Sequence, residues 1–341
     1  MLVPYPTRPG CEREELMLAS TKTEGGAGRF SALAGLKGAT GPLIGLILLC
    51  VFLTFATDKF MSVRNILNVM DQISVLGIMA VGMTLVILIG GIDLAVGSVL
   101  ALAMMVMGYL FKTAGMPMGV AIVLALAVSA LSGAVSGLLI TLFRVPAFIA
   151  TLAMMSVARG LANMITDGQQ IVGFPSWFSM LAYSRLGGFL TLTVAIMLVV
   201  FVLGWAYLRY SAGGRSLYAI GGNPEVARLA GINVNAFTVG VYVVSGFLAG
   251  LAGVVLAMRL DSVQPTAGVS YELDTIAAVV IGGTSLTGGR GGIVGTIIGV
   301  LIIGVLRNGL NLLSVSPFLQ AVVIGIVIAL AVAAESFKKA S

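Results

Sequence analysis

Long apolar runs that follow one another along most of the chain constrain this sequence more than any other feature. Only 9% of the 341 residues are charged, whereas a soluble domain usually carries about 25%. Hydrophobic residues make up 59% of the chain, so polar residues are too few to cover a water-soluble globule. A spanning helix needs about 20 mostly apolar residues, and runs of that kind recur from residue 42 onward. The sequence therefore predicts an all-α integral membrane protein.

The apolar runs predict about ten transmembrane helices. Two stretches, around 90–98 and 275–290, are interrupted by Gly-Gly pairs and polar residues, so we expect short or broken helices there. The sequences around them, LVILIGGIDLAVGSVLAL and AAVVIGGTSLTGGRGGIVGTIIG, align loosely with each other. The apolar core of the second stretch, IAAVVIGG, is too short to cross a bilayer alone. The predicted spans are 42–57, 72–92, 94–111, 119–143, 145–165, 189–209, 236–259, 275–289, 291–313 and 318–334.

The distribution of lysine and arginine predicts which side of the membrane each loop faces. When the N-terminus is placed in the cytoplasm, most of the 19 basic residues fall in inner segments, as the positive-inside rule requires. An even number of spans then places the C-terminus in the cytoplasm as well. The net charge of +6 is therefore read as a topology signal, with no nucleic acid as a partner. The predicted parts are a disordered cytoplasmic tail (1–41), a transmembrane domain (42–335) with a cytoplasmic loop (210–235), and a cytoplasmic C-terminal tail (336–341).

Residue types that carry enzyme chemistry are scarce. The chain has no histidine, which is the commonest metal ligand and general base, and no GxxxxGK[ST] phosphate-binding loop. Its two cysteines, Cys11 and Cys50, make no disulfide framework. We therefore expect no catalytic residue, metal or cofactor in this chain, and an energy source that lies in a partner or an ion gradient.

One polar island, AIGGNPEVARLAGINV (219–234), carries clear helix signals within the predicted cytoplasmic loop. Asn223 is a good N-cap because its side-chain oxygen can accept from a free N–H of the first turn. Pro224 suits the first helical position, and Glu225 places negative charge at the positive end of the helix dipole. Gly231 stands where a left-handed residue commonly ends a helix. These signals predict a short helix over 224–230.

The predicted helix is amphipathic but too short to be stable alone in water. Val226, Leu229 and Ala230 share one apolar face. Glu225 and Arg228 are i,i+3 neighbours on another face. The apolar face needs a surface to rest on, and the residues themselves leave two surfaces open: the membrane or a cytoplasmic partner.

A few polar residues interrupt the predicted spans. Asp93 follows a Gly-Gly pair between two long apolar runs. It either caps the helix that starts at residue 94, at the inner water interface, or acts as a gate or structural lock. Arg307, Asn308 and Asn311 lie in a late span, where such side chains either turn toward a pathway or hold helices together by hydrogen bonds.

Two of the predicted outer loops are unusual in composition. Residues 166–188 carry Phe174, Trp177 and Phe178, which suit an aromatic belt at the membrane interface better than a docking face. Residues 260–274 carry three acidic residues and no basic one, in agreement with an outer loop.

Four blocks of the sequence resemble the permease subunits of ribose/xylose/arabinose-type ABC sugar importers. They are GGNPEVARLAGINV, AVGMTLVILIGGIDLAVGSVLAL (80–102), VPAFIATLAMMSVARGL (145–161), and the long block from QPTAGVSYELD to NGLNLLSVSPF (264–318). The resemblance spans residues 45–335. One small departure is Ala95, which stands where the family often has serine.

This resemblance implies a set of partners and a location. It implies a homodimer of permease subunits in the lipid of the bacterial inner membrane, with ABC ATPase subunits on the cytoplasmic face and a periplasmic sugar-binding protein on the other. ATP and Mg would be bound by the ATPase partner and not by this chain. The polar island is then similar to a coupling helix that fits a groove of the ATPase. The residues of that coupling helix are Asn223, Pro224, Glu225, Val226, Ala227, Arg228, Leu229, Ala230 and Gly231.

The function expected from the sequence is therefore import of a monosaccharide, ribose-like or a related sugar or polyol, with Asp93, Asn308 and Asn311 as possible pathway or gating residues. An ion-coupled secondary transporter is the first alternative, but it would need intramembrane charge relays. An ABC permease for a non-sugar small polar solute is the second. A membrane enzyme would need clustered catalytic groups, and a structural scaffold would not explain the coupling-type helix.

Overall fold

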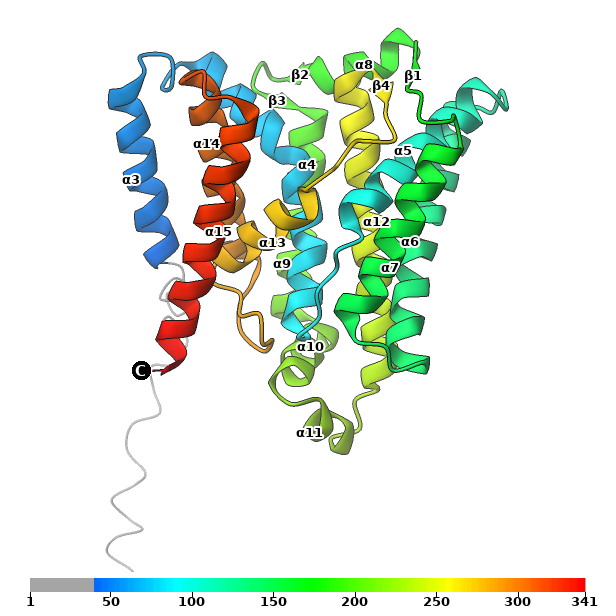
Figure 1. Ribbon diagram of the computed structural model, residues 1–341, viewed down its shortest axis with the longest axis vertical. Helices are drawn as coiled ribbons and strands as arrows, with labels where there is room; N and C mark the ends of the chain where they lie inside the picture. The colour runs from blue at the N-terminus through cyan, green and yellow to red at the C-terminus, as the bar shows by residue number, and fades with distance from the viewer. Residues whose placement is uncertain (1–39, 341) are drawn as a thin grey trace, which may run out of the picture. The chain divides into compact units, whose positions relative to one another are not determined.

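The computed structural model describes residues 40–340, almost all of them in helices or the turns between helices (Figure 1). The predicted N-terminal tail, which includes Cys11, lies outside the described residues apart from its last two positions. Residues 336–340 of the predicted C-terminal tail lie in the last turns of the final helix, and residue 341 lies outside the described residues. The helices are α3 (Thr40–Ala56), α4 (Val63–Leu88), α5 (Val96–Lys112), α6 (Met118–Leu142), α7 (Ala147–Met164), α8 (Ser176–Tyr183), α9 (Leu192–Tyr210), α10 (Ala212–Gly222), α11 (Pro224–Leu229), α12 (Val234–Leu260), α13 (Tyr271–Ile281), α14 (Ile293–Leu312) and α15 (Pro317–Ala340).

Four very short strands tie the connections together at one end of the helices. β1 (Ile171–Val172) pairs antiparallel with β4 (Ser262–Val263), so that the segment before α8 is joined to the segment after α12. β2 (Arg185–Leu186) and β3 (Leu190–Thr191) form a small hairpin ahead of α9. This end, with α8, lies opposite the end that carries α10 and α11 (Figure 1).

Six of the described helices are long and apolar enough to cross a membrane: α4, α6, α7, α9, α12 and α14. α3, α5 and the first part of α15 are apolar but shorter. The prediction of an all-α membrane protein is confirmed, whereas the count of about ten spanning helices is not.

Both predicted interruptions are present. α4 ends at Leu88 and α5 begins only at Val96, while α13 ends at Ile281 and α14 begins at Ile293. We call the segment 89–95 the first break and the segment 282–292 the second break. α13 has 11 residues, about 16 Å of helix, which is half of the roughly 30 Å hydrocarbon core of a bilayer. Both α13 and the second break therefore depend on neighbouring protein, because lipid cannot satisfy exposed backbone groups.

The core forms where α12 packs against α4, α5 and α6. Small residues allow the backbones of α6 and α12 to approach each other closely. A methyl group at Gly133 of α6 would lie 2.1 Å from the Tyr242 carbonyl oxygen, and one at Gly246 of α12 would lie 2.4 Å from the Ser129 carbonyl oxygen. Helix association in lipid depends on such backbone contact, since lipid is as apolar as the side chains.

Two of the three acidic residues in the predicted outer loop 260–274 are buried. Glu272 and Asp274 lie in the first turn of α13 and are buried. Asp274 pairs with Arg307 of α14, so its charge is compensated inside the protein. Arg159 of α7 reaches the same region and donates to the carbonyl oxygens of Pro265, at 2.5 Å, and Ala267, at 2.8 Å.

Candidate functional site

α11 has the N-terminal cap that the sequence predicts. The Asn223 side-chain oxygen accepts from the backbone N–H of Glu225 at 2.9 Å and of Val226 at 3.1 Å. Asn223 itself is extended, with φ −161° and ψ 108°, as an N-cap should be. Pro224 occupies the first helical position, where its missing N–H has no cost.

The C-terminal end of α11 also follows the prediction. Gly231 has a φ of 83°, in the left-handed region. Its N–H donates to the Arg228 carbonyl, and the next N–H, of Ile232, donates to the Ala227 carbonyl, each at 3.0 Å. This is the Schellman pattern, which satisfies the carbonyl groups at the end of a helix. α11 is thus a rigid helix of six residues closed at both ends.

The burial of α11 differs from the simple amphipathic picture. Ala227 is the buried residue, and it packs with Ile220 and Val234, while the Ile89 side chain lies against the same cluster. Val226 and Leu229 face away from the chain and are 59% and 89% exposed. The apolar face predicted to rest on a surface therefore has no partner among the described residues. Glu225 and Arg228 form an ion pair on the helix surface.

α10 lies in the predicted cytoplasmic loop 210–235, where it precedes α11 and connects it to the membrane helices. Ser211 caps it, because the Ser211 hydroxyl accepts from the Gly214 N–H at 2.8 Å. Leu217 and Ile220 of α10 are buried. The four glycines in GGRSLYAIGG hid this helix from a propensity argument, although the Ser211 cap and the Leu217–Ile220 spacing were visible signals.

Asp93 lies in the first break and is buried, with 4% of its surface exposed. One carboxylate oxygen accepts from the Ala95 N–H at 3.0 Å, next to the start of α5. The other accepts from the Ser245 hydroxyl of α12 at 2.7 Å. The geometry combines parts of both hypotheses, because Asp93 orders the entry to α5 and also bonds the break to α12. It does so as a buried residue, and its role in gating stays a prediction.

The polar residues of α14 bond to neighbouring helices. Asn308 and Asn65 of α4 exchange two amide hydrogen bonds, at 2.9 and 3.0 Å, and both are buried. Asn311 accepts from the Gln320 side chain of α15 at 2.8 Å. These contacts agree with the interhelical interpretation, while the pathway role of Asn308 and Asn311 stays a prediction.

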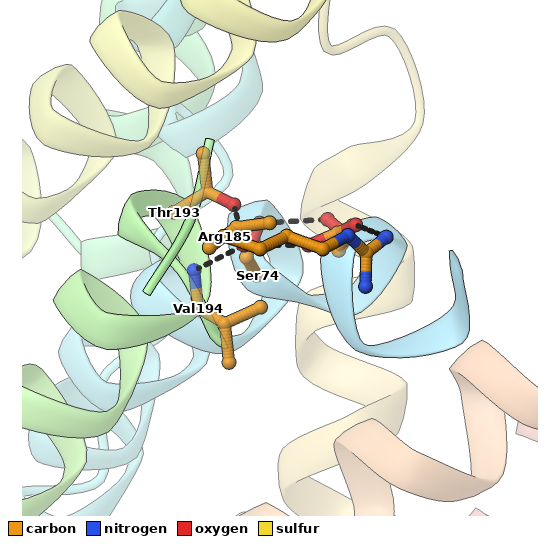
Figure 2. Close-up of polar contacts among 6 residues, drawn as sticks. Ser74, Arg185, Thr193 and Val194 are labelled. Atoms are coloured by element: carbon orange, nitrogen blue, oxygen red, sulfur yellow. Dashed lines mark hydrogen bonds and ion pairs between the residues drawn. The ribbon is translucent and has the colours of Figure 1, made fainter. Parts of the chain in front are cut away.

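A polar cluster that sequence reasoning missed joins α4 to the connection between α8 and α9. Asp71 of α4 accepts from the Thr191 hydroxyl at 2.6 Å and from Arg185 at 3.5 Å. Thr191 in turn accepts from the Val194 N–H and bonds to the Thr193 hydroxyl (Figure 2). Asp71 is more than 110 positions away in sequence from both Arg185 and Thr191, so no local pattern could have revealed this cluster.

Within the part of the chain that the structure describes, no group of three or more Asp, Glu or Cys side chains gathers closely enough to hold a metal ion. The described features of functional interest are a capped helix with an exposed apolar tip and two interrupted helices.

Residues 65–332 match the family described as "Branched-chain amino acid transport system / permease component". The chain belongs to this permease family. It is 47% identical to the ribose import permease protein of Bacillus subtilis over 308 residues, which cover 90% of this chain and 95% of that protein. The ribose import permease of Escherichia coli strain K12 is also 47% identical, covering 87% and 93% of the two chains. The fructose import permease of Rhizobium meliloti is 37% identical, covering 88% and 85%. No solved structure matches the chain.

As a permease component, the chain is a part of a transport system and not an enzyme. The matched region includes both breaks, α10 and α11.

Proposed function

We propose that this chain is the membrane-spanning subunit of an ATP-binding-cassette importer and forms the pathway for a monosaccharide, ribose or a related sugar or polyol. The observation that carries the proposal is the 47% identity to ribose import permeases over about nine tenths of the chain. Fructose and allose import permeases follow at 37% identity, so the names of these relatives agree on sugars.

α11 supports an ATPase subunit as the cytoplasmic partner. A helix of six residues closed at both ends moves as a rigid body, and its exposed Val226 and Leu229 offer apolar contact to a groove. Exposed apolar side chains at a protruding tip are a common sign of an interaction site. We propose that residues 223–231 dock into the ATPase, which binds the ATP and Mg.

The remaining partners complete the proposed assembly. A periplasmic sugar-binding protein would deliver the substrate to the end with α8, and two copies of this chain would form a homodimer in the inner-membrane lipid. α7 supports a second copy or lipid as its cover, because Phe148, Ile149 and Leu152 are more than 40% exposed. In this proposed arrangement, both termini and α11 lie in the cytoplasm. In Figure 1 the N-terminal end of α3 and the C-terminal end of α15 point toward the side that carries α11.

Reconstitution tests this function directly. Proteoliposomes with this chain, its ATPase and its binding protein should accumulate labelled ribose only when ATP is supplied, and ionophores should not stop uptake. Uptake driven by a proton or sodium gradient without ATP would instead support a secondary transporter. That alternative needs the test because Asp93, Glu272 and Asp274 are buried acidic residues.

The family description also names branched-chain amino acids, which makes a non-sugar solute the second candidate. Competition separates the two. Unlabelled ribose should abolish uptake of labelled ribose, whereas a hundredfold excess of leucine, on the order used to saturate a site, should leave it unchanged.

Docking of α11 has its own test. Leu229→Asp places a charge at the most exposed apolar position of α11, and Ala227 packing remains intact. The variant should lose association with the ATPase while remaining folded. Phe143→Asp, at an exposed apolar position of the connection between α6 and α7, is the matched control for a new surface charge. Equal retention of the ATPase by both variants would contradict docking at α11.

A further inference from the structure

The two breaks meet each other through their backbones. The Gly289 N–H of the second break donates to the Leu88 carbonyl, at the end of α4, at 2.9 Å. A methyl group at Gly288 would lie 2.9 Å from the backbone nitrogen of Gly90, so the two glycines are nearly in contact. The break after α4 and the break before α14 are thus joined at one point.

α10 reaches the same point. A methyl group at Gly221 would lie 1.8 Å from the Leu88 carbonyl oxygen and 2.3 Å from the Gly289 nitrogen. No side chain fits there, because real Cβ atoms do not approach other atoms to within 3 Å. The neighbouring Gly222 has no atom within 4 Å of the corresponding position. Of these two adjacent glycines, only Gly221 lies where a side chain cannot fit. We call Leu88, Gly90, Gly221, Gly288 and Gly289 the glycine junction.

Two side-chain contacts fasten the surroundings of the glycine junction. The Tyr218 hydroxyl of α10 donates to the Gly291 carbonyl of the second break at 2.9 Å. Burial raises the pKa of this hydroxyl above its ordinary value, so it stays protonated and able to donate at neutral pH. On the other side, Ile89 of the first break lies against the cluster that holds Ala227 of α11.

A continuous series of contacts therefore leads from α11 to both breaks. Ala227 packs on Ile220 of α10, and the next residue of α10, Gly221, touches Leu88 at the end of α4 and Gly289 of the second break, while Gly90 of the first break lies against Gly288. Close-packed protein has low compressibility and transmits displacement, and backbone contacts leave no side chain that could rotate out of the way. If α11 moves by about 1 Å, Leu88 and Gly289 must move with it, or the contacts of the glycine junction must separate.

We propose that the glycine junction is the coupling point of the transporter, where movement of α10 and α11 displaces the two interrupted membrane helices in step. This inference rests on the proposed function, since ATP-driven movement must enter at α11. It adds specific residues: Gly221 as the central contact, with Tyr218 as a second attachment to the second break. Both are positioning residues, because neither is required to touch the substrate.

The decisive comparison is Gly221→Ala against Gly222→Ala. Both variants add one methyl group at adjacent positions of α10, but only the first meets backbone atoms. Gly221→Ala should still bind the ATPase and allow ATP hydrolysis, while ribose transported per ATP falls by about tenfold or more, within the usual range of coupling between sites. Gly222→Ala should retain binding, hydrolysis and transport within about twofold of the wild type.

Tyr218→Phe provides a second readout that does not depend on tolerating a clash. Loss of its hydroxyl should lower transport per ATP by about two- to fivefold at unchanged ATPase binding. Tyr210→Phe, at an exposed tyrosine of α9, is the control and should have no effect.

The outcomes of these experiments distinguish this inference from the proposed importer function on which it rests. Wild-type uptake that needs no ATP would overturn the proposed importer. ATP-driven uptake by the wild type, together with equal transport per ATP in Gly221→Ala and Gly222→Ala, would overturn the glycine junction alone. Wild-type coupling in Tyr218→Phe would count against the second attachment.

Discussion

The first and second breaks begin in the same way and are then held differently. The Gly90 N–H donates to the Ile87 carbonyl, and the Gly91 N–H donates to the Val86 carbonyl. In the second break, the N–H groups of Gly283 and Thr284 donate to the carbonyls of Val280 and Val279 in the same pattern. Gly90 and Gly283 are both left-handed, with φ of 78° and 90°. Each helix is therefore ended by the same Schellman motif, which follows the loose alignment of the two sequences.

Beyond these shared ends, the first break is fixed mainly by side chains, whereas the second is fixed mainly by backbone bonds, with the Tyr218 hydroxyl as an added side-chain contact. Asp93 bonds to Ser245, and the Ile92 carbonyl accepts from Tyr242 at 3.3 Å and from Thr151 at 3.2 Å. In the second break, the Ser285 N–H donates to the Arg290 carbonyl at 2.9 Å, and the Gly288 N–H donates to the Ser285 carbonyl. A similar pattern of glycines can therefore give one turn that is held by side chains of other helices and one loop that is held mainly by backbone bonds and touches α10.

The two regions also compensate their buried carboxylates differently. Asp93 accepts from neutral donors, whereas Asp274, ahead of the second break, pairs with Arg307. Arg307→Ala leaves Asp274 as a buried charge without its partner. The free energy of unfolding should fall by about 3 kcal/mol, at the low end for a buried pair because Arg307 is one third exposed. Chemical unfolding in detergent measures the loss.

The double variant Asp274→Asn with Arg307→Gln is the control for this pair. It removes both charges, so it should recover most of the lost stability. A double variant as unstable as Arg307→Ala would mean that Arg307 acts through packing and not through charge.

Ser245→Ala tests the anchor of the first break. It removes one of the two described donors to the Asp93 carboxylate, so we expect a loss of about 2 kcal/mol in the free energy of unfolding. Ser179→Ala removes an exposed bond of the same kind, to Asp261, and should cost less than about 0.5 kcal/mol. Equal effects in these two variants would show that Asp93 does not depend on α12.

Gly90→Ala and Gly283→Ala test whether the two helix ends are equivalent. Each forces alanine into a left-handed conformation, which should cost about 1–2 kcal/mol. Gly160→Ala, at a helical glycine with open space around it, should be neutral or stabilising. Thermal unfolding of all three variants provides the measurement. If only one of Gly90→Ala and Gly283→Ala is destabilised, the two helix ends are alike in sequence but not equivalent in structure.

The smallest effect is expected at α11, which connects to both breaks. Asn223→Ala removes the N-cap and should destabilise α11 locally by about 1 kcal/mol, whereas Asn223→Asp should preserve the cap. Hydrogen exchange at the amides of Glu225 and Val226 should become faster only in the alanine variant. Unchanged exchange would indicate that Ala227 packing alone fixes α11.

Local signals explain which parts of the structure the sequence could predict. Asn223, Pro224 and Gly231 set the ends of α11 through bonds within a few residues, so their roles were visible in one short stretch. The two breaks were visible for the same reason, because Gly-Gly pairs and polar residues interrupt apolar runs that otherwise favour helix.

Distant contacts explain what the sequence could not predict. The acidic character of 260–274 suggested an outer loop, but the burial of Asp274 could not be predicted, because its partner Arg307 is 33 positions away. The burial of Ala227 in place of Val226 and Leu229 depends on Ile220 and Val234, which lie on other helices. Similarly, the need for glycine at position 221 and not at 222 comes from Leu88 and Gly289.

The shortness of α13 has a consequence for the order in which the protein is made. Its 11 residues and the irregular backbone of the second break cannot satisfy their polar groups in lipid, so they depend on neighbouring helices. Asp274 leaves the ribosome before Arg307, the residue that compensates its charge. During synthesis, α4 and α12 are already available, but α13 cannot settle until α14 has emerged. α13 is therefore expected to be among the last elements to fold, after helices that lie on both sides of it in the chain.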